Sequence, residues 1–129
     1  MNEKMTVATT SELIAMAEYL KHGYTISLPF SPARYDFIAE KNGMSVRVQV
    51  KHGSPFNNGK ELLGFSSKPY ERSEIDVVVM VDTQTDQIYY IPANHVEGMT
   101  SIRLRLEPYK TSVGEGKALM AEHYKKFIG

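Results

Sequence analysis

Three residues suited to metal-assisted hydrolysis stand close together in the stretch RYDFIAEKNGMSVRVQVKHG, residues 34–53. A carboxylate such as that of Asp36 is a hard oxygen ligand for Mg²⁺, and the amide oxygen of Gln49 or a nearby backbone carbonyl, such as that of Val50, supplies a second ligand. An ammonium group such as that of Lys51 can orient a water molecule and stabilise charge on a phosphorane-like transition state. Together these groups predict hydrolysis of a phosphodiester. The alternative interpretation is a solvated polar face of a sheet without any chemistry.

A β-hairpin is the element that must position these residues. Asn42-Gly43 suits a two-residue type I′ turn, because both residues accept positive φ. The numbers of paired residues then sum to 85, which places Asp36 opposite Gln49. Side chains alternate between the two faces of a strand. The predicted core face carries Tyr35, Phe37, Ala39, Val46, Val48 and Val50. The predicted polar face carries Asp36, Ile38, Glu40, Ser45, Arg47, Gln49 and Lys51.

An amphipathic helix is predicted before the hairpin, in TTSELIAMAEYLKHGY, residues 9–24. Thr9 and Glu12 have the spacing of a capping box at its start, and Gly23 is predicted to end it. The apolar residues recur at the spacing of one helical face, which we expect to face the core. They are Leu13, Met16, Ala17 and Leu20. A short strand is expected in YTISLPF, residues 24–30.

The rest of the chain predicts more strands and a final helix. Residues 52–73 are expected to be irregular, with a short strand at residues 61–65. The continuous apolar run of residues 75–81 is typical of a strand buried on both faces, and a further strand is expected at residues 88–92. Residues 101–106 alternate, with Ile102, Leu104 and Leu106 expected inward and Arg103 and Arg105 outward. Residues 114–128 are expected to form a helix.

Two charged positions have predicted structural partners. Arg47 and Glu40 are expected to form a cross-strand ion pair. Asp76 opens the buried strand and is expected to hydrogen-bond within the fold.

Composition limits the class of protein. A chain of 129 residues with 42% hydrophobic residues predicts a single domain, residues 1–129. Lys+Arg and Asp+Glu both number 15, so binding of a polyanion requires a local patch. There is no cysteine, and the four histidines lack metal-ligand spacing, which argues against a zinc site. No apolar stretch has the length of a membrane helix or a signal core, so we expect a cytoplasmic protein.

The motif resembles that of the PD-(D/E)XK nuclease superfamily, in which an Asp is followed at a distance by (D/E)-x-K. Here it stands as YD at residues 35–36 and QVK at residues 49–51. A subgroup with Gln at the middle position includes homing endonucleases of group I introns. The likeness extends over roughly residues 11–110. It includes SELIAMAEYLKHGYTISLPF, YERSEIDVVVMVDTQTDQIYYIP and SIRLRLEPYK.

The resemblance implies a single-domain α/β fold of the restriction-endonuclease type, with a mixed sheet of four to five strands flanked by helices. It implies a DNA endonuclease that uses Mg²⁺ or Mn²⁺ and acts as a homodimer or homotetramer. Asp36 would be a metal ligand, Gln49 would occupy the second ligand position, and Lys51 would activate water. Glu12 matches the acid of the family's N-terminal helix, so it would contribute to the metal site directly or through water.

Two alternatives remain beside the homing-type enzyme. An archaeal-type Holliday junction resolvase shares the superfamily core, although its motif normally carries an acid where Gln49 stands. A DNA-binding or assembly module with a decayed nuclease site would also explain the missing acid. In any of these, the expected contacts to a DNA backbone are Lys60, Lys68, Arg72 and His52.

Overall fold

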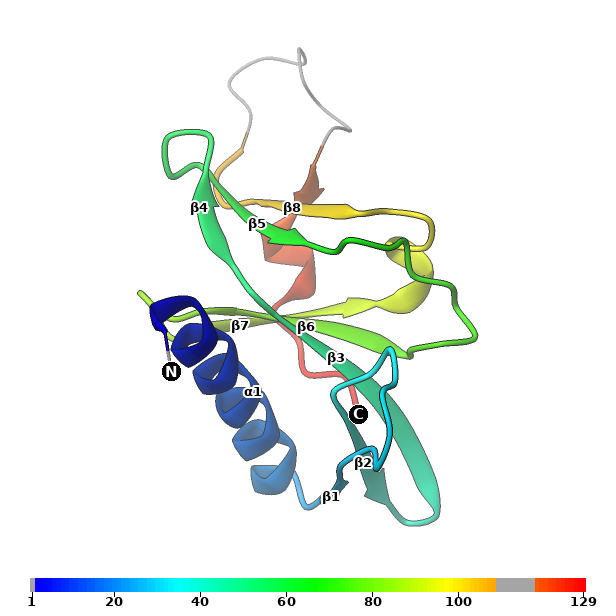
Figure 1. Cartoon of the computed structure of the whole chain (residues 1–129). Coiled ribbons are helices and arrows are strands. Elements are labelled where there is room, and N and C mark those ends of the chain that lie inside the picture. The colour runs from blue at the N-terminus through cyan, green and yellow to red at the C-terminus, as the bar shows by residue number, and fades with distance from the viewer. Residues whose placement is uncertain (1, 109–117) are drawn as a thin grey trace.

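The computed structural model describes residues 2–108 and 118–129. Its main sheet has the strand order β1-β2-β3-β6-β7. The strands are β1 (Thr25–Ser27), β2 (Phe37–Lys41), β3 (Met44–His52), β6 (Val77–Asp82) and β7 (Gln87–Pro92). β3 and β6 are parallel, and the other neighbours are antiparallel. The predicted α/β fold with a mixed sheet of four to five strands is therefore confirmed (Figure 1).

A second sheet, which the sequence did not predict, lies beyond the end of β3. Its order is β4-β5-β8-β9. The strands are β4 (Ser54–Phe56), β5 (Glu61–Phe65), β8 (Ser101–Arg105) and β9 (Leu119–Met120). β4 follows β3 after Gly53 alone, so a nearly continuous extended segment passes from the main sheet into the second one (Figure 1). Residues 54–56, expected to be irregular, thus form a strand, whereas the short strand expected at residues 61–65 is confirmed as β5.

The N-terminal helix α1 (Glu3–Lys21) is longer than predicted. The side chain of Asn2 caps it by accepting a hydrogen bond from the backbone N–H of Met5 at 2.8 Å. Thr9 and Glu12 therefore lie inside the helix, and the predicted capping box is wrong. Helix capping therefore does not account for an acidic residue at position 12.

α1 also packs through a different face from the one expected. Its buried residues are Ser11, Ala15 and Tyr19, whereas Leu13 and Leu20 are 60% and 57% exposed. The aromatic ring of Tyr19 contacts four other rings, and its hydroxyl donates to the carbonyl of Ile128 at 2.5 Å. The four rings are those of Tyr24, Phe37, Tyr90 and Phe127. Burial of one large ring with a satisfied hydroxyl outweighs the burial of two leucines in setting the rotation of this helix.

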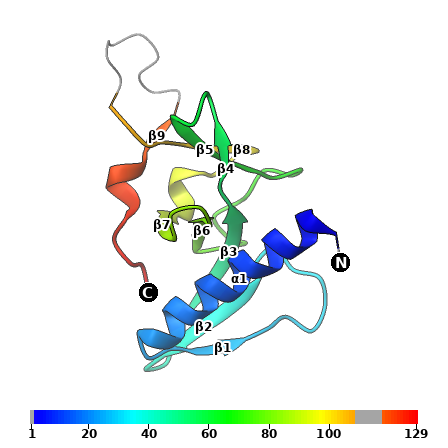
Figure 2. The same ribbon diagram turned by 90° about the vertical axis from the view of Figure 1, so that its left-hand side faces the viewer.

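The core has two parts, one on each side of the main sheet. Between α1 and the sheet lie Tyr19, Phe37, Ala39, Val46, Val48, Val50, Val77, Val79 and Val81. On the other side, residues of β6 and β7 pack against the second sheet and the C-terminal segment, including Val78, Met80, Leu62, Leu104 and Tyr124. All six residues of β6 are buried, so the predicted strand with two buried faces is confirmed. Figure 2 shows α1 lying in front of the strands that it covers.

The register of the predicted hairpin is confirmed. Phe37 pairs with Val48 and Lys41 with Met44, and the turn residues Asn42 and Gly43 have φ of 53° and 77°. The predicted assignment of side chains to the two faces of the hairpin is wrong only at the start of the first strand. Tyr35 packs against the core on the far side of the sheet, because β2 begins at Phe37 and the alternation does not extend back beyond it.

The ion pair expected between Arg47 and Glu40 is replaced by another. Arg47 Nε donates to Asp76 Oδ2 at 3.0 Å, and Arg47 also donates to the carbonyl of Ser73. Arg72 Nη1 donates to Asp76 Oδ1 at 2.9 Å. The structural role predicted for Asp76 is therefore confirmed.

The end of the chain departs from prediction in two further respects. In β8 the arginines do not extend outward into solvent as expected. Both face the fully buried carboxylate of Glu61: Arg103 donates to it at 2.7 and 2.9 Å, and Arg105 is buried beside it. Leu106, expected inward, is 39% exposed. The helix expected over residues 114–128 begins outside the described residues. Its described part forms β9 and a short 3₁₀ helix, η2 (Ala121–Tyr124). Among the described residues, α1 is therefore the only α-helix.

Candidate active site

A cleft of about 920 Å³ lies between the N-terminal half of α1 and the segment that runs from the end of β3 into the second sheet. α1 and its N-cap residue contribute Asn2, Glu3, Lys4, Val7, Ala8 and Glu12. The chain before β2 and the end of β3 contribute Asp36, Gln49, Val50, Lys51 and His52. The second sheet contributes Ser54, Leu63 and Phe65. The four predicted catalytic residues, Glu12, Asp36, Gln49 and Lys51, thus line one cleft.

Asp36 is fixed against the strand that carries the other polar residues. Its backbone N–H donates to the carbonyl of Val48 at 2.7 Å. Its side-chain Oδ2 accepts a hydrogen bond from the backbone N–H of Val50, also at 2.7 Å. These two bonds fix the carboxylate beside β3 and leave Oδ1 for another partner. Because β2 begins one residue later, the orientation of Asp36 is set by these bonds rather than by the pleat of the strand.

Glu12 faces Asp36 from the helix. Burial raises the pKa of Glu12 to about 7, and a hydrogen bond between the two carboxyl groups and repulsion by the Asp36 charge act in the same direction. Ionisation of Glu12 is therefore unfavourable beside the Asp36 carboxylate. A cation bound between the two groups would offset this repulsion.

Gln49 and Lys51 approach the same cleft from β3. Gln49 Nε2 donates to the backbone carbonyl of Val50 at 3.3 Å, so the amide lies beside the carbonyl predicted as a ligand. Lys51 lies two residues further along the strand, with its ammonium nitrogen 5.8 Å from the centroid of the Tyr70 ring. Gln49, Val50 and Lys51 are all less than half exposed.

The donors in the cleft fit a small hard cation. Within the part of the chain that the structure describes, no three His, Cys, Asp or Glu side chains are grouped so as to share an ion. A divalent ion here would be held by the carboxyl pair of Glu12 and Asp36, with the Gln49 amide and the Val50 carbonyl as neutral oxygen donors. Mg²⁺ prefers oxygen ligands and retains several waters, so it does not require an all-protein shell. The raised pKa of Glu12 has the sign expected where a cation would replace a proton.

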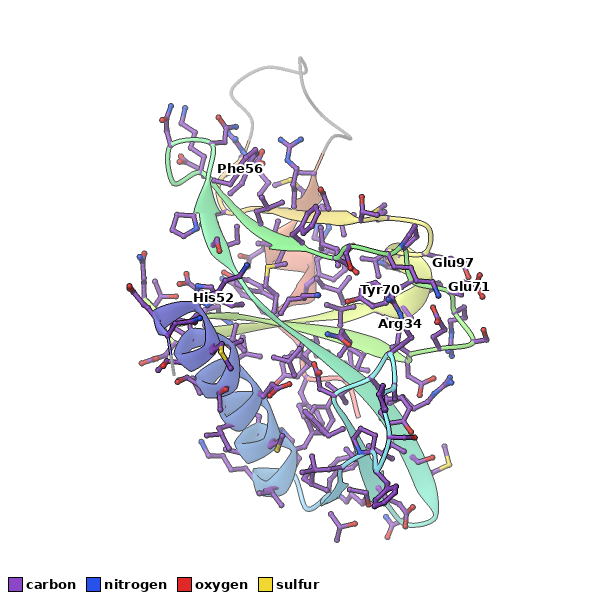
Figure 3. The ribbon with its side chains drawn as sticks, viewed as in Figure 1. Arg34, His52, Phe56, Tyr70, Glu71 and Glu97 are labelled. Carbon is purple, nitrogen blue, oxygen red and sulfur yellow. The ribbon has the colours of Figure 1, made fainter. Side chains whose placement is uncertain are left out.

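The residues expected to contact DNA lie in three different places. His52 lines the cleft, and its buried Nδ1 has no hydrogen-bond partner. Figure 3 places it near the N-terminal end of α1. Lys60 lies in the turn between β4 and β5, where its backbone is held by Asn57 and Leu106. Lys68 and Arg72 border a second hollow of about 580 Å³, and Arg72 is paired with Asp76.

Several cleft residues were not found from the sequence. Lys4 and Ala8 precede Glu12 by eight and four residues, so they share its helical face, but the predicted helix began too late to include them. Leu63 and Phe65 alternate on β5 and line the cleft, a pattern that could be recognised in ELLGF only once that strand is paired with β4.

Comparisons with known proteins agree with the fold and the motif. The sequence model of a family described as PD-(D/E)XK endonuclease matches residues 1–127. The chain therefore belongs to the PD-(D/E)XK endonuclease family, and this membership supports a nuclease activity. The resemblance drawn from residues 35–36 and 49–51 is confirmed.

Among solved structures, a bacterial homing endonuclease is similar to this chain with a TM-score of 0.77 and 15% sequence identity. The likeness covers 96% of this chain and 89% of the homing endonuclease, and at that identity it shows the shared fold. A search of curated proteins gives no match. Among the described residues, no helix has the length and apolar character needed to cross a membrane.

Proposed function

We propose that this protein is a divalent-metal-dependent endonuclease that hydrolyses phosphodiester bonds in DNA. The observation that carries the proposal is the convergence of the Glu12–Asp36 carboxyl pair with Lys51 in one cleft. Family membership supports the nuclease activity, and the carboxyl pair supports the requirement for a cation.

Each residue has a distinct role in this proposal. Glu12, Asp36, Gln49 and the Val50 carbonyl would hold Mg²⁺ or Mn²⁺, which when bound polarises the phosphate and makes water easier to deprotonate. Lys51 orients the attacking water and stabilises the negative charge that grows on the phosphate oxygens. Water adds to phosphorus, one P–O ester bond breaks, and the leaving oxygen takes a proton.

The uncharged Gln49 has a consequence for this site. A glutamine contributes no negative charge, so attraction for the cation comes from the two carboxyl groups alone. Glu12 must lose its proton for the cation to bind, and its pKa of about 7 makes that binding sensitive to pH near neutrality.

We further propose a sequence-specific homing-type enzyme that cuts both strands of duplex DNA. The solved homing endonuclease with the same fold supports this choice over a junction resolvase. The described chain has one such site, so cutting both strands requires a second copy, in a homodimer or a homotetramer. His52, Lys60, Lys68 and Arg72 are proposed to contact the DNA backbone.

A cleavage panel tests the function. The purified protein is incubated with linear duplex, a four-way junction and single-stranded DNA, each with Mg²⁺, Mn²⁺ or EDTA. Metal-dependent cutting of linear duplex supports the homing-type enzyme, whereas cutting confined to the junction identifies a resolvase.

Variants of the site separate an enzyme from a binding module. Asp36→Ala and Lys51→Ala should each abolish cutting while DNA binding persists. A wild-type protein that binds DNA but cuts none of the substrates with either metal would be the decayed module, which Gln49 makes the second candidate.

A further inference from the structure

The side chain of Lys51 lies against the backbone of β5 at Gly64, a residue without a side chain. A Cβ atom added to Gly64 would lie 3.2 Å from Cβ and 3.5 Å from Cγ of Lys51. It would also lie 2.8 Å from the terminal methyl of Met80. Glycine is therefore the residue that leaves room for the first part of the lysine stem, because any side chain would occupy the same space.

The charged end of Lys51 lies near an aromatic ring. Its ammonium nitrogen is 5.8 Å from the centroid of the Tyr70 ring, within the range of a cation–π contact. Tyr70 is only 3% exposed, so the ring cannot turn away into solvent. Its backbone is fixed as well, since the carbonyl of Tyr70 accepts from the N–H of Gly98 at 2.9 Å.

Arg34 holds the same ring from the chain that leads to Asp36. Its guanidinium carbon is 4.4 Å from the Tyr70 centroid, and Figure 3 shows the two side chains together. Arg34 Nη2 donates to the carbonyls of Lys68 and Pro69 at 2.7 and 3.2 Å. The segment that carries Tyr70 is thereby joined to the chain two residues before the proposed metal ligand.

We propose that Gly64 and Tyr70 are positioning residues that direct Lys51 toward the reacting phosphate, an inference that rests on the proposed nuclease function. A lysine side chain has four rotatable bonds and many rotamers, so its ammonium group can occupy many different positions. Packing of the stem on Gly64 and the contact with Tyr70 restrict these rotamers. Such restriction raises the fraction of complexes with a correctly placed ammonium and leaves DNA affinity unchanged.

Tyr70→Leu and Tyr70→Phe test the role of the ring. Phenylalanine keeps the π face that contacts Lys51, whereas leucine removes it. We expect Tyr70→Leu to lower the single-turnover cleavage rate about three- to tenfold with the dissociation constant for DNA unchanged. Tyr70→Phe should cleave at the wild-type rate. Tyr124→Leu is a matched control, because Tyr124 is a buried tyrosine of the same core cluster whose ring packs against His95.

Gly64→Ala tests the support of the stem independently of the ring. The added methyl would press on Cβ of Lys51. That atom is bonded directly to the backbone of β3, so it cannot move far without moving the strand. The methyl of Met80, at the end of a flexible side chain, can move aside. We expect the cleavage rate to fall about tenfold with DNA affinity retained.

NMR spectroscopy provides a readout that does not depend on cleavage. In the wild type, the Hε protons of Lys51 should be shifted upfield by the ring current of Tyr70, with the signal assigned from its loss in Lys51→Arg. Tyr70→Leu should remove the shift, and Tyr70→Phe and Tyr124→Leu should retain it.

The outcomes distinguish this inference from the proposed function. A shift that is absent in the wild type overturns the positioning contact whether or not the protein cuts DNA. A Tyr70→Leu variant that loses the shift yet cuts as fast as wild type also overturns the inference, while the nuclease function stands. If the shift behaves as expected but no protein form cuts DNA, the proposed function fails, and with it the catalytic purpose of the contact.

Discussion

Replacing Glu12 by glutamine should make the metal-free protein more stable at pH 8. In the folded chain, burial and the neighbouring Asp36 carboxylate raise the pKa of Glu12 from its ordinary 4.5 to about 7. Ionisation of Glu12 above that pH therefore opposes folding. Glutamine has the same shape, carries no charge and can donate an N–H to Asp36, so it removes the repulsion and keeps the hydrogen bond.

The direction of the pH effect follows from the raised pKa. An acid with a higher pKa in the folded than in the unfolded chain favours folding in its protonated form. The favourable contribution is complete below pH 4.5, decreases as the pH rises through the interval from 4.5 to about 7, and is absent above it. The variant should therefore match wild type near pH 4.5 and exceed it at pH 8.

The size of the effect is limited by the partial exposure of Glu12. The full rise in pKa corresponds to at most about 3 kcal/mol, and screening by solvent reduces this to about 1 to 2 kcal/mol. For a chain of this length, that is an increase of about 3 to 10 °C in Tm.

Thermal unfolding followed by circular dichroism at pH 4.5 and pH 8, in EDTA, measures the effect. Glu40→Gln serves as the control for net charge, because Glu40 is exposed on β2. With Mg²⁺ at pH 8, wild type should gain more stability than Glu12→Gln, since the ion replaces the lost proton. A variant that is equally stable or less stable than wild type at pH 8 in EDTA would refute the proposed carboxyl pair.

Three further substitutions test the framework around the cleft. Asp76→Asn should lower the free energy of unfolding by about 1 to 3 kcal/mol. Burial alone would raise the pKa of Asp76, but hydrogen bonds from Arg47 and Arg72 outweigh it and lower the pKa to about 2. The wild-type advantage should thus be complete above about pH 4 and disappear as the pH falls toward 2, as urea titrations at several pH values would show. Glu61→Gln should cost about 3 to 5 kcal/mol, because the buried carboxylate takes hydrogen bonds from Arg103 at 2.7 and 2.9 Å and lies beside the buried Arg105, and both arginines lose this charged partner. A loss below about 1 kcal/mol in urea unfolding would contradict this. Gly43→Ala, at φ of 77°, should cost about 1 kcal/mol yet leave the cleavage rate of the folded protein unchanged, and a slower single-turnover rate would tie the turn to the site.

The parts of the fold that the sequence predicted are those set by local chemistry. The Asn42-Gly43 turn fixes the pairing register by its positive φ values, so the placement of Gln49 and Lys51 on the polar face of β3 followed from a count of residues. The buried strand β6 was equally clear, because an uninterrupted apolar run has few other interpretations.

The errors arose where distant partners decide the outcome. Leu13 and Leu20 have helical spacing, but the ring of Tyr19 contacts other aromatic residues and turns a different face of α1 toward the sheet. The alternation in β8 predicts that the Arg105 side chain faces outward, but this side chain is buried beside the carboxylate of Glu61. Neither partner is visible in a local pattern.

The candidate site was predicted in part for the same reason. Asp36, Gln49 and Lys51 belong to one hairpin, so their proximity could be reasoned from pairing alone. Glu12 was assigned through family resemblance, and its contact with Asp36 depends on how α1 packs on the sheet. Tyr70 gave no signal, because its contact with Lys51 joins two segments without a periodic relation.

The most direct test of the proposed chemistry is nicking of supercoiled plasmid by wild type, Asp36→Asn and Lys51→Ala, each with Mg²⁺ and with EDTA. Wild type should nick or linearise the plasmid only with Mg²⁺, and both variants should bind DNA without cutting it. Cutting by wild type in EDTA, or by Asp36→Asn at the wild-type rate, would contradict a metal-dependent site built on this carboxylate.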